Sequence, residues 1–206
     1  MAIEIWLAFT ITCIVMLSIP GPTVMLIVSY VVGKGAKTAW ATAPGVVLGD
    51  FTAMTISLAG AGALLATSAT LFTTMKLIGA AYLIWLGIKL WRSKPALSEL
   101  HATPNACDNK KMFWNSYIVT ALNPKSIVFF IAFVPQFVDT AKPLLIQFAI
   151  LEMTFLTLAG LNIIIWALLV GRMRKLFSSP KILARLNKAG GSLLIGAGLI
   201  TATVRD

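Results

Sequence analysis

Two prolines and a glycine interrupt the first apolar stretch of the chain, and this interruption constrains the fold more than any other feature. The stretch runs from Ile5 to Val32, long enough to cross a bilayer as one helix, and contains Pro20-Gly21-Pro22. Proline lacks an N–H and clashes with the carbonyl four residues earlier, so the helix must break or kink there. Broken backbone inside a membrane is tolerated only where it is buried in protein or lines a cavity. The break therefore indicates one half of a site.

A second proline break lies farther along the chain. Each of the two breaks is followed, at the same separation, by an acidic residue. A single shift of the sequence lays Pro22 over Pro124 and also Asp50 over Glu152. We interpret this as a duplicated three-helix unit. The units are expected at residues 1–92 for the first three-helix repeat, 93–112 for a cytoplasmic linker and 113–206 for the second three-helix repeat.

The composition places the chain in a membrane. Of its 206 residues 58% are hydrophobic and only 12% are charged, more apolar surface than a soluble domain of this size could cover. We expect an all-α, polytopic membrane protein with six transmembrane helices, of which the first and fourth are broken. The spans are expected at 5–32, 39–66, 71–91, 113–137, 144–170 and 189–204. The segment from Ser179 to Lys188 predicts either a short amphipathic helix on the membrane surface or a merely basic loop.

The basic residues are distributed unevenly between the loops. Thirteen of the seventeen Lys and Arg residues follow spans one, three and five. The positive-inside rule then places both termini on the periplasmic side, away from the cytoplasm. With three spans in each unit the second unit must run opposite to the first, which predicts a 3+3 inverted repeat. The net charge of +10 therefore sets the topology and does not indicate nucleic acid.

Three charged residues are expected deep in the membrane, where a charge costs at least about 2.5–3.5 kcal/mol. Asp50 and Glu152 are the acids, and each is either a neutral, hydrogen-bonded carboxyl or a functional proton or ammonium site. Lys125 is the base, and we expect it to pair with an acid or with a substrate carboxylate. Gly45 and Gly49 precede Asp50 as a G-x-x-x-G pattern, which lets a neighbouring helix approach closely.

Other kinds of site find little support. His101, Cys107 and Asp108 lie in the polar loop, but their spacing matches no metal site, so an ordinary solvated loop is the favoured interpretation. The one histidine of the chain is in that loop, and no Ser/His/Asp set is available for catalysis. We expect no catalytic residues, no metal and no cofactor.

Several motifs together resemble a known family. They are Pro20-Gly21-Pro22, Gly45-Val46-Val47-Leu48-Gly49-Asp50, Asn123-Pro124-Lys125-Ser126 and Pro135-Gln136-Phe137. The chain resembles the LysE/RhtB family of amino-acid exporters over nearly its whole length. The resemblance implies a bacterial inner-membrane carrier that expels amino acids, with coupling to the proton gradient.

The sequence thus predicts a secondary transporter that exports a small amino acid through a site near the membrane midplane. Half-helix N-termini at Thr23 and Ser126, with Lys125, would receive the carboxylate. Asp50 is favoured as the proton carrier and Glu152 as the ammonium contact. The full expected substrate set is Pro20, Gly21, Pro22, Thr23, Asn123, Pro124, Lys125 and Ser126.

Two alternatives stay open, a passive channel and a metal-ion carrier. The expected partners are an amino-acid substrate, the proton and the lipid bilayer. The sequence leaves open whether two copies pair as a homodimer and which amino acid is carried.

Overall fold

The computed structural model describes residues 1–67, 69–93, 108–139, 141–172 and 179–203, and every regular element in these ranges is helical. The elements are α1 (Ile3–Ser18), α2 (Pro22–Lys34), η1 (Ala36–Thr38), α3 (Ala39–Thr67), α4 (Ala69–Arg92), α6 (Asn109–Ala121), α7 (Pro124–Ala132), η2 (Val134–Phe137), α8 (Leu144–Arg172) and α10 (Pro180–Thr203). The expected all-α class is confirmed. Residues 94–107 of the expected linker, with His101 and Cys107, lie outside the described residues.

Both predicted breaks are present. The chain bends by 53° between α1 and α2 and by 44° between α6 and α7. Among the described helices α3 and α8 are by themselves long and apolar enough to cross a membrane, and each bent pair meets the same requirements when taken together. The surface carries large apolar side chains such as Ile56 and Leu145, which are 68% and 81% exposed. A bilayer covers such a surface, so the chain is a membrane protein with up to four candidate spans.

The G-x-x-x-G pattern of α3 brings α6 close, as the sequence predicts. A Cβ placed at Gly49 would lie 2.7 Å from the carbonyl oxygen of Tyr117, and one at Gly45 would meet the carbonyl oxygen of Phe113. Real Cβ atoms cannot approach backbone so closely, so only glycine permits this packing. The contact fixes the part of α3 that carries Asp50 against the helix that leads into the second break.

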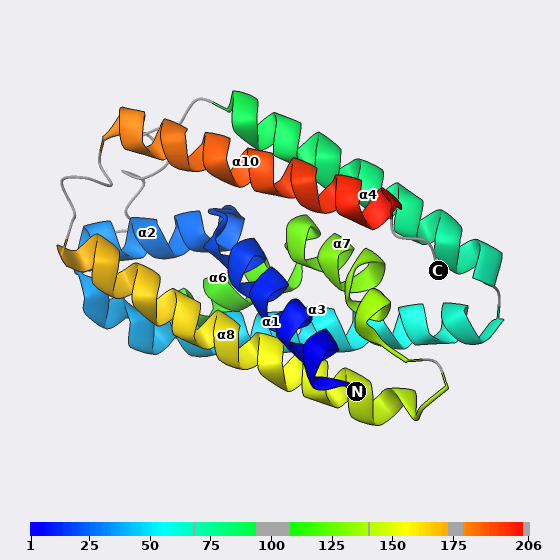
Figure 1. Ribbon diagram of the computed structural model, residues 1–206. Coiled ribbons are helices and arrows are strands. Elements are labelled where there is room, and N and C mark those ends of the chain that lie inside the picture. Colours follow the sequence, from blue (N-terminus) through cyan, green and yellow to red (C-terminus); the bar gives the residue numbers. More distant parts are fainter. Residues whose placement is uncertain (68, 94–107, 140, 173–178, 204–206) are drawn as a thin grey trace.

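A second glycine contact joins α4 and α10, which run side by side along one edge of the molecule (Figure 1). A Cβ at Gly87 would lie 2.7 Å from the carbonyl oxygen of Gly191, and one at Gly198 equally close to that of Ala80. This packing explains one difference from the sequence-based expectation. The segment that begins at Pro180 is neither a separate amphipathic helix nor a loop, because it continues through Gly191 as the single helix α10.

The helix ends sort into two groups. Helices α2 and α8 end and α10 begins at the left of Figure 1, and α4 ends left of the centre, whereas α1 begins and α10 ends farther to the right. The last turns of α2, α4 and α8 each carry a basic residue, namely Lys34, Arg92 and Arg172, so the end of the molecule at which α2 and α8 finish is its basic end. The half-helices α2 and α7 leave their breaks in opposite directions, α2 toward this basic end and α7 away from it (Figure 1).

Candidate functional site

The two breaks meet inside the molecule. Asn123 Nδ2, at the second break, donates a hydrogen bond of 3.2 Å to Thr23 Oγ1, at the first. The hydroxyl of Thr23 also lies 3.2 Å from that of Thr120 in α6, close enough for a hydrogen bond. All three side chains are buried. Residues about a hundred positions apart therefore form one polar centre, as the duplicated breaks predict.

The second break is closed by its own cap. Asn123 is the N-cap of α7, and its Oδ1 accepts a 3.1 Å hydrogen bond from the backbone N–H of Lys125. Pro124, at the first helical position, has no N–H to satisfy. Ser126 is buried in the same first turn. The backbone N–H of Lys125, at the N-terminus of α7, thus already has a hydrogen-bond acceptor.

The first break differs, because the N-cap of α2 is Gly21 and no side chain in the described part of the chain caps this helix. Pro22 again supplies no N–H, so the first free donors of α2 are the backbone groups of Thr23 and Val24. Gly21, Thr23 and Val24 all line an internal cavity. A positive helix end with unpaired donors therefore faces this cavity.

Lys125 reaches across to the end of α1. Its side chain is only 7% exposed, and Nζ donates to the carbonyl oxygens of Met16 at 3.2 Å and of Ile19 at 2.9 Å. A Cβ placed at Gly21 would lie 3.3 Å from Nζ, so the glycine leaves room for the lysine. The expected partner, an acid or a substrate carboxylate, is replaced here by carbonyls. The negative end of a helix attracts an ammonium for the same electrostatic reason.

Asp50 lies on α3 at the same cavity. Its side chain is 3% exposed, and among the described residues no hydrogen-bond partner reaches Oδ1. A buried carboxyl oxygen without a partner is costly and points to a group that gains a partner at another stage of function.

The cavity that joins these groups has a volume of about 30 Å³, close to the share of one liquid water. Five of the eight expected substrate residues line it, namely Gly21, Thr23, Asn123, Lys125 and Ser126, together with Asp50. Pro20, Pro22 and Pro124 do not line it and instead shape the two breaks. A volume of this size cannot hold an amino acid, so helices must move apart before one can enter.

Glu152 is not brought to this cavity. The residue is half-buried on α8, and its Oε1 accepts a 2.6 Å hydrogen bond from Thr55 Oγ1 on α3. The structure therefore separates the two acids. Asn162, farther along α8, does line the cavity and donates from Nδ2 to the carbonyl oxygen of Leu17 at 3.2 Å.

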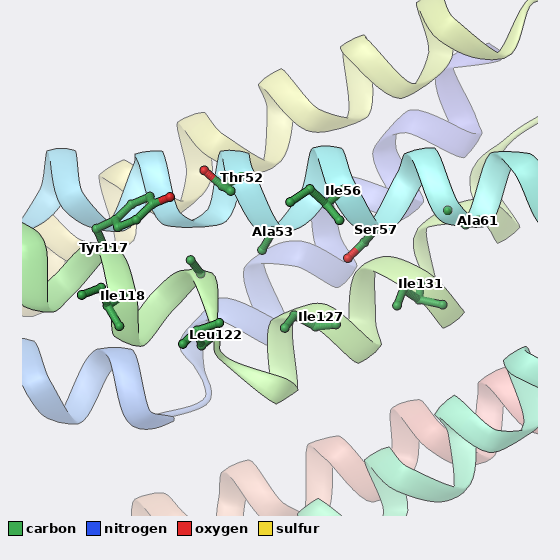
Figure 2. A pocket seen from close by; sticks show the side chains of 12 residues that line it. Thr52, Ala53, Ile56, Ser57, Ala61, Tyr117, Ile118, Leu122, Ile127 and Ile131 are labelled. Atoms are coloured by element: carbon green, nitrogen blue, oxygen red, sulfur yellow. The ribbon is translucent and has the colours of Figure 1, made fainter.

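A larger hollow lies outside the bundle core, between α3, α6 and α7 (Figure 2). It has a volume of about 550 Å³, and none of its lining residues is an acid or a base. Its lining includes Ile56 on α3, Ile118 on α6, Leu122 directly after α6, and Ile127 on α7 (Figure 2). Such a mostly apolar surface suits lipid tails and offers an ammonium or a carboxylate no side chain of opposite charge.

Two broken helices meet at a buried acid and a buried base inside an apolar helical bundle. This arrangement is typical of one class of protein, the membrane transporters. The LysE type translocator family matches residues 14–203 of this chain. The chain belongs to the LysE type translocator family, and it is therefore a transporter and not an enzyme. The resemblance stated from the motifs is confirmed.

Related proteins extend over the full chain. An uncharacterized membrane protein of Vibrio cholerae serotype O1 is 33% identical over 100% of both chains. The homoserine/homoserine lactone efflux protein of Salmonella typhi is 33% identical over 100% of this chain and 99% of its own. The leucine efflux protein of Enterobacter sp. is 34% identical over 60% of this chain and 58% of its own. No solved structure matches.

Proposed function

We propose that the chain is a secondary-active carrier that exports a small amino acid across the bacterial inner membrane in exchange for protons. The observation that carries this proposal is the buried cavity at the meeting of the two breaks. It combines the uncapped N-terminus of α2 with Lys125 and with Asp50, whose Oδ1 has no partner among the described residues. A zwitterion needs both a positive and a negative partner, and this cavity supplies both.

The names of the related proteins support amino-acid chemistry. They describe efflux of homoserine, homoserine lactone and leucine. Homoserine and its lactone share the α-ammonium group, but only homoserine has a free carboxylate. If this chain carries compounds of the same kind, the ammonium is the group that its site must always recognise.

A six-span, 3+3 inverted repeat is part of the proposal. Support comes from the two bent pairs and from the opposite directions of α2 and α7 (Figure 1). The third helix of each proposed unit also packs on the broken helix of the other unit. A Cβ at Gly79 of α4 would meet Ala132 of α7, and one at Gly190 of α10 would lie 2.7 Å from Ile19, at the end of α1. Rocking of residues 1–92 against 113–206 would open the cavity to each side in turn, with both termini periplasmic.

Within the site we assign separate tasks to the charged groups. The free N–H groups at the start of α2 receive the substrate carboxylate, since a helix N-terminus stabilises an anion. Asp50 carries the proton, because it is the acid at the cavity. Glu152 is paired with Thr55 away from the cavity.

A counterflow screen in proteoliposomes tests the proposal. The purified protein is reconstituted with one unlabelled amino acid inside, and uptake of the labelled compound is measured for the twenty common amino acids, homoserine and homoserine lactone. We expect transient accumulation of at least one of them above its equilibrium level, which a passive channel cannot produce. Counterflow of none of these compounds would contradict the proposed function.

A metal-ion carrier is tested in the same vesicles with divalent cations. Among the residues the structure describes, no group of three or more His, Cys, Asp or Glu could hold a metal ion.

A further inference from the structure

We propose that the carbonyl oxygens of Met16 and Ile19 form the binding subsite for the α-ammonium of the substrate. Lys125 occupies this subsite when the substrate is absent and moves to Asp50 when the substrate displaces it. This inference rests on the proposed function, since it says how the amino acid is recognised and how its binding is linked to the proton.

The chain itself shows what the subsite accepts. The group held by the two carbonyls is the primary ammonium of Lys125, at 3.2 Å and 2.9 Å. The α-ammonium of an amino acid has the same charge and the same three donors. The oxygens belong to the C-terminal end of α1, where the helix dipole favours a cation, and the surroundings are buried. The α-ammonium of the substrate can therefore replace the ammonium of Lys125, because it makes the same kind of hydrogen bonds.

The first break can also bind both charges of an amino acid at once. Carbonyl oxygens at the end of α1 precede Gly21, and the free N–H groups of Thr23 and Val24 follow it. In an α-amino acid a single carbon separates the ammonium from the carboxylate, so the two ends of one break can hold the two groups. The second break lacks this capacity, because Asn123 already caps the N-terminus of α7.

Asp50 provides the position to which Lys125 can move. Both side chains line the same small cavity, and the carboxyl has an oxygen without a partner among the described residues. The other residues that line it, contributed by α1, α2, α3, α7, α8 and the two breaks, have no titratable side chain. Within this cavity, the displaced ammonium therefore has one titratable partner.

When Lys125 exchanges the carbonyls for Asp50, one proton is released. In this proposal Asp50 is a neutral carboxylic acid and Lys125 a charged ammonium when the substrate is absent. When the substrate ammonium takes the carbonyls, Lys125 pairs with Asp50, and the O–H bond of the acid breaks to give a carboxylate and one free proton. One proton leaves for each substrate bound, and the reverse occurs when the substrate departs. Binding of the two is thereby mutually exclusive, which is what antiport requires.

Replacing Lys125 by Met tests the displacement step. Lys125→Met removes the ammonium while keeping a long apolar side chain, so the carbonyls are open to the substrate from the start. We expect substrate-for-substrate exchange to persist at an unchanged or lower half-saturating concentration. Proton release, followed with a pH dye when the amino acid found by counterflow is added to the detergent-solubilised protein, should fall to background. Release equal to that of the unmodified protein would overturn the displacement step.

Lys142→Met is the matched control. Lys142 is exposed, pairs with Asp139 at 3.1 Å and lies outside the cavity. This variant should keep both exchange and proton release. If Lys125→Met does not fold, competition by modified substrates in the unmodified protein tests the proposal instead.

Competition by modified substrates tests the subsite in the unmodified protein. The N-acetyl derivative of the transported amino acid has no ammonium, whereas its methyl ester keeps it. We expect the N-acetyl derivative to compete at least about tenfold more weakly than the parent, the loss typical of removing hydrogen bonds to a charged group. The methyl ester should compete better than the N-acetyl derivative. Equal competition by the N-acetyl derivative would overturn the subsite.

Asp50→Asn separates this subsite from the alternative in which Asp50 itself holds the ammonium. The variant should bind the parent more weakly, because the displaced Lys125 finds no carboxylate, but it should still prefer the parent over the N-acetyl derivative, because the carbonyls of α1 are unchanged. Equal binding of the parent and the N-acetyl derivative in this variant would assign the ammonium to Asp50 instead. Failure of the proposed function has a different signature, since no compound would then show counterflow in the unmodified protein.

Discussion

The Nζ atom of Lys125 lies 2.9 Å from the carbonyl oxygen of Ile19, 106 residues earlier in the chain. This contact joins the second half of one broken helix to the first half of the other. Asn123 and Thr23 form a parallel link a few residues away. If the two proposed repeats rock against each other, these bonds between them must stretch or exchange partners. In the proposed function the polar centre is both the substrate site and the contact on which opening depends.

The topology can be checked first. Because the last turns of α2, α4 and α8 carry basic residues, we expect both termini to be periplasmic. A reporter that is active only in the cytoplasm should stay silent when fused to the C-terminus. The same reporter inserted after Ser93 should be active. An active C-terminal fusion would contradict the inverted-repeat arrangement.

The prolines at the breaks give a second prediction. In the double variant Pro22→Ala, Pro124→Ala the chain regains two N–H groups, and helical hydrogen bonding can extend across the breaks. We expect transport to fall about tenfold or more while the amount of folded protein and its melting temperature are unchanged or higher. Pro44→Ala is the control, since Pro44 lies inside α3 away from both breaks. Full transport by the double variant would show that the breaks are only kinks.

The glycines of α3 predict a difference in stability within one helix. Gly49→Ala places a Cβ only 2.7 Å from the carbonyl oxygen of Tyr117, so α3 and α6 must separate. We expect a loss of about 1–3 kcal/mol in the free energy of unfolding. In the described part of the chain no atom outside the neighbouring backbone lies within 4 Å of a Cβ at Gly60, so Gly60→Ala should be neutral or slightly stabilising. Thermal unfolding of the purified protein measures both, and equal melting temperatures would argue against the close contact.

The two acids are expected to behave differently. Asp50→Asn removes the titrating group at the cavity, so gradient-driven efflux should be lost while substrate exchange remains. Glu152→Gln should keep exchange near the level of the unmodified protein, because a glutamine oxygen can accept the same hydrogen bond from Thr55. The pH dependence of efflux measures the difference. Loss of coupling in Glu152→Gln alone would move the proton to that residue.

Much of this arrangement follows from local signals in the sequence. Proline and glycine restrict or free the backbone wherever they occur, so Pro22 and Pro124 predict the breaks, and Gly45 and Gly49 predict the close helix contact. The length of α10 was wrong in the prediction because the basic segment that ends at Lys188 was separated from the apolar span at 189–204, whereas the structure joins the two in one helix.

The contacts of the site were harder to predict. The partners of Lys125 are backbone carbonyls. Every residue has a carbonyl, so the sequence contains no residue type that marks these partners. Thr120 joins the polar centre through an ordinary hydroxyl without a motif. The place of Glu152 depends on the rotation of α8, and matching positions in two repeats do not determine which face of a helix turns inward.

Proton movement linked to amino-acid movement in the same vesicles is the most direct test of the account. Proteoliposomes are loaded with the amino acid identified by counterflow, and a pH dye inside reports protons while the labelled substrate reports efflux. We predict that an inwardly directed proton gradient accelerates efflux, that efflux in turn makes the interior more acidic, and that Asp50→Asn abolishes both effects but not exchange. Efflux at the same rate with and without the gradient, with no change of internal pH, would contradict the account.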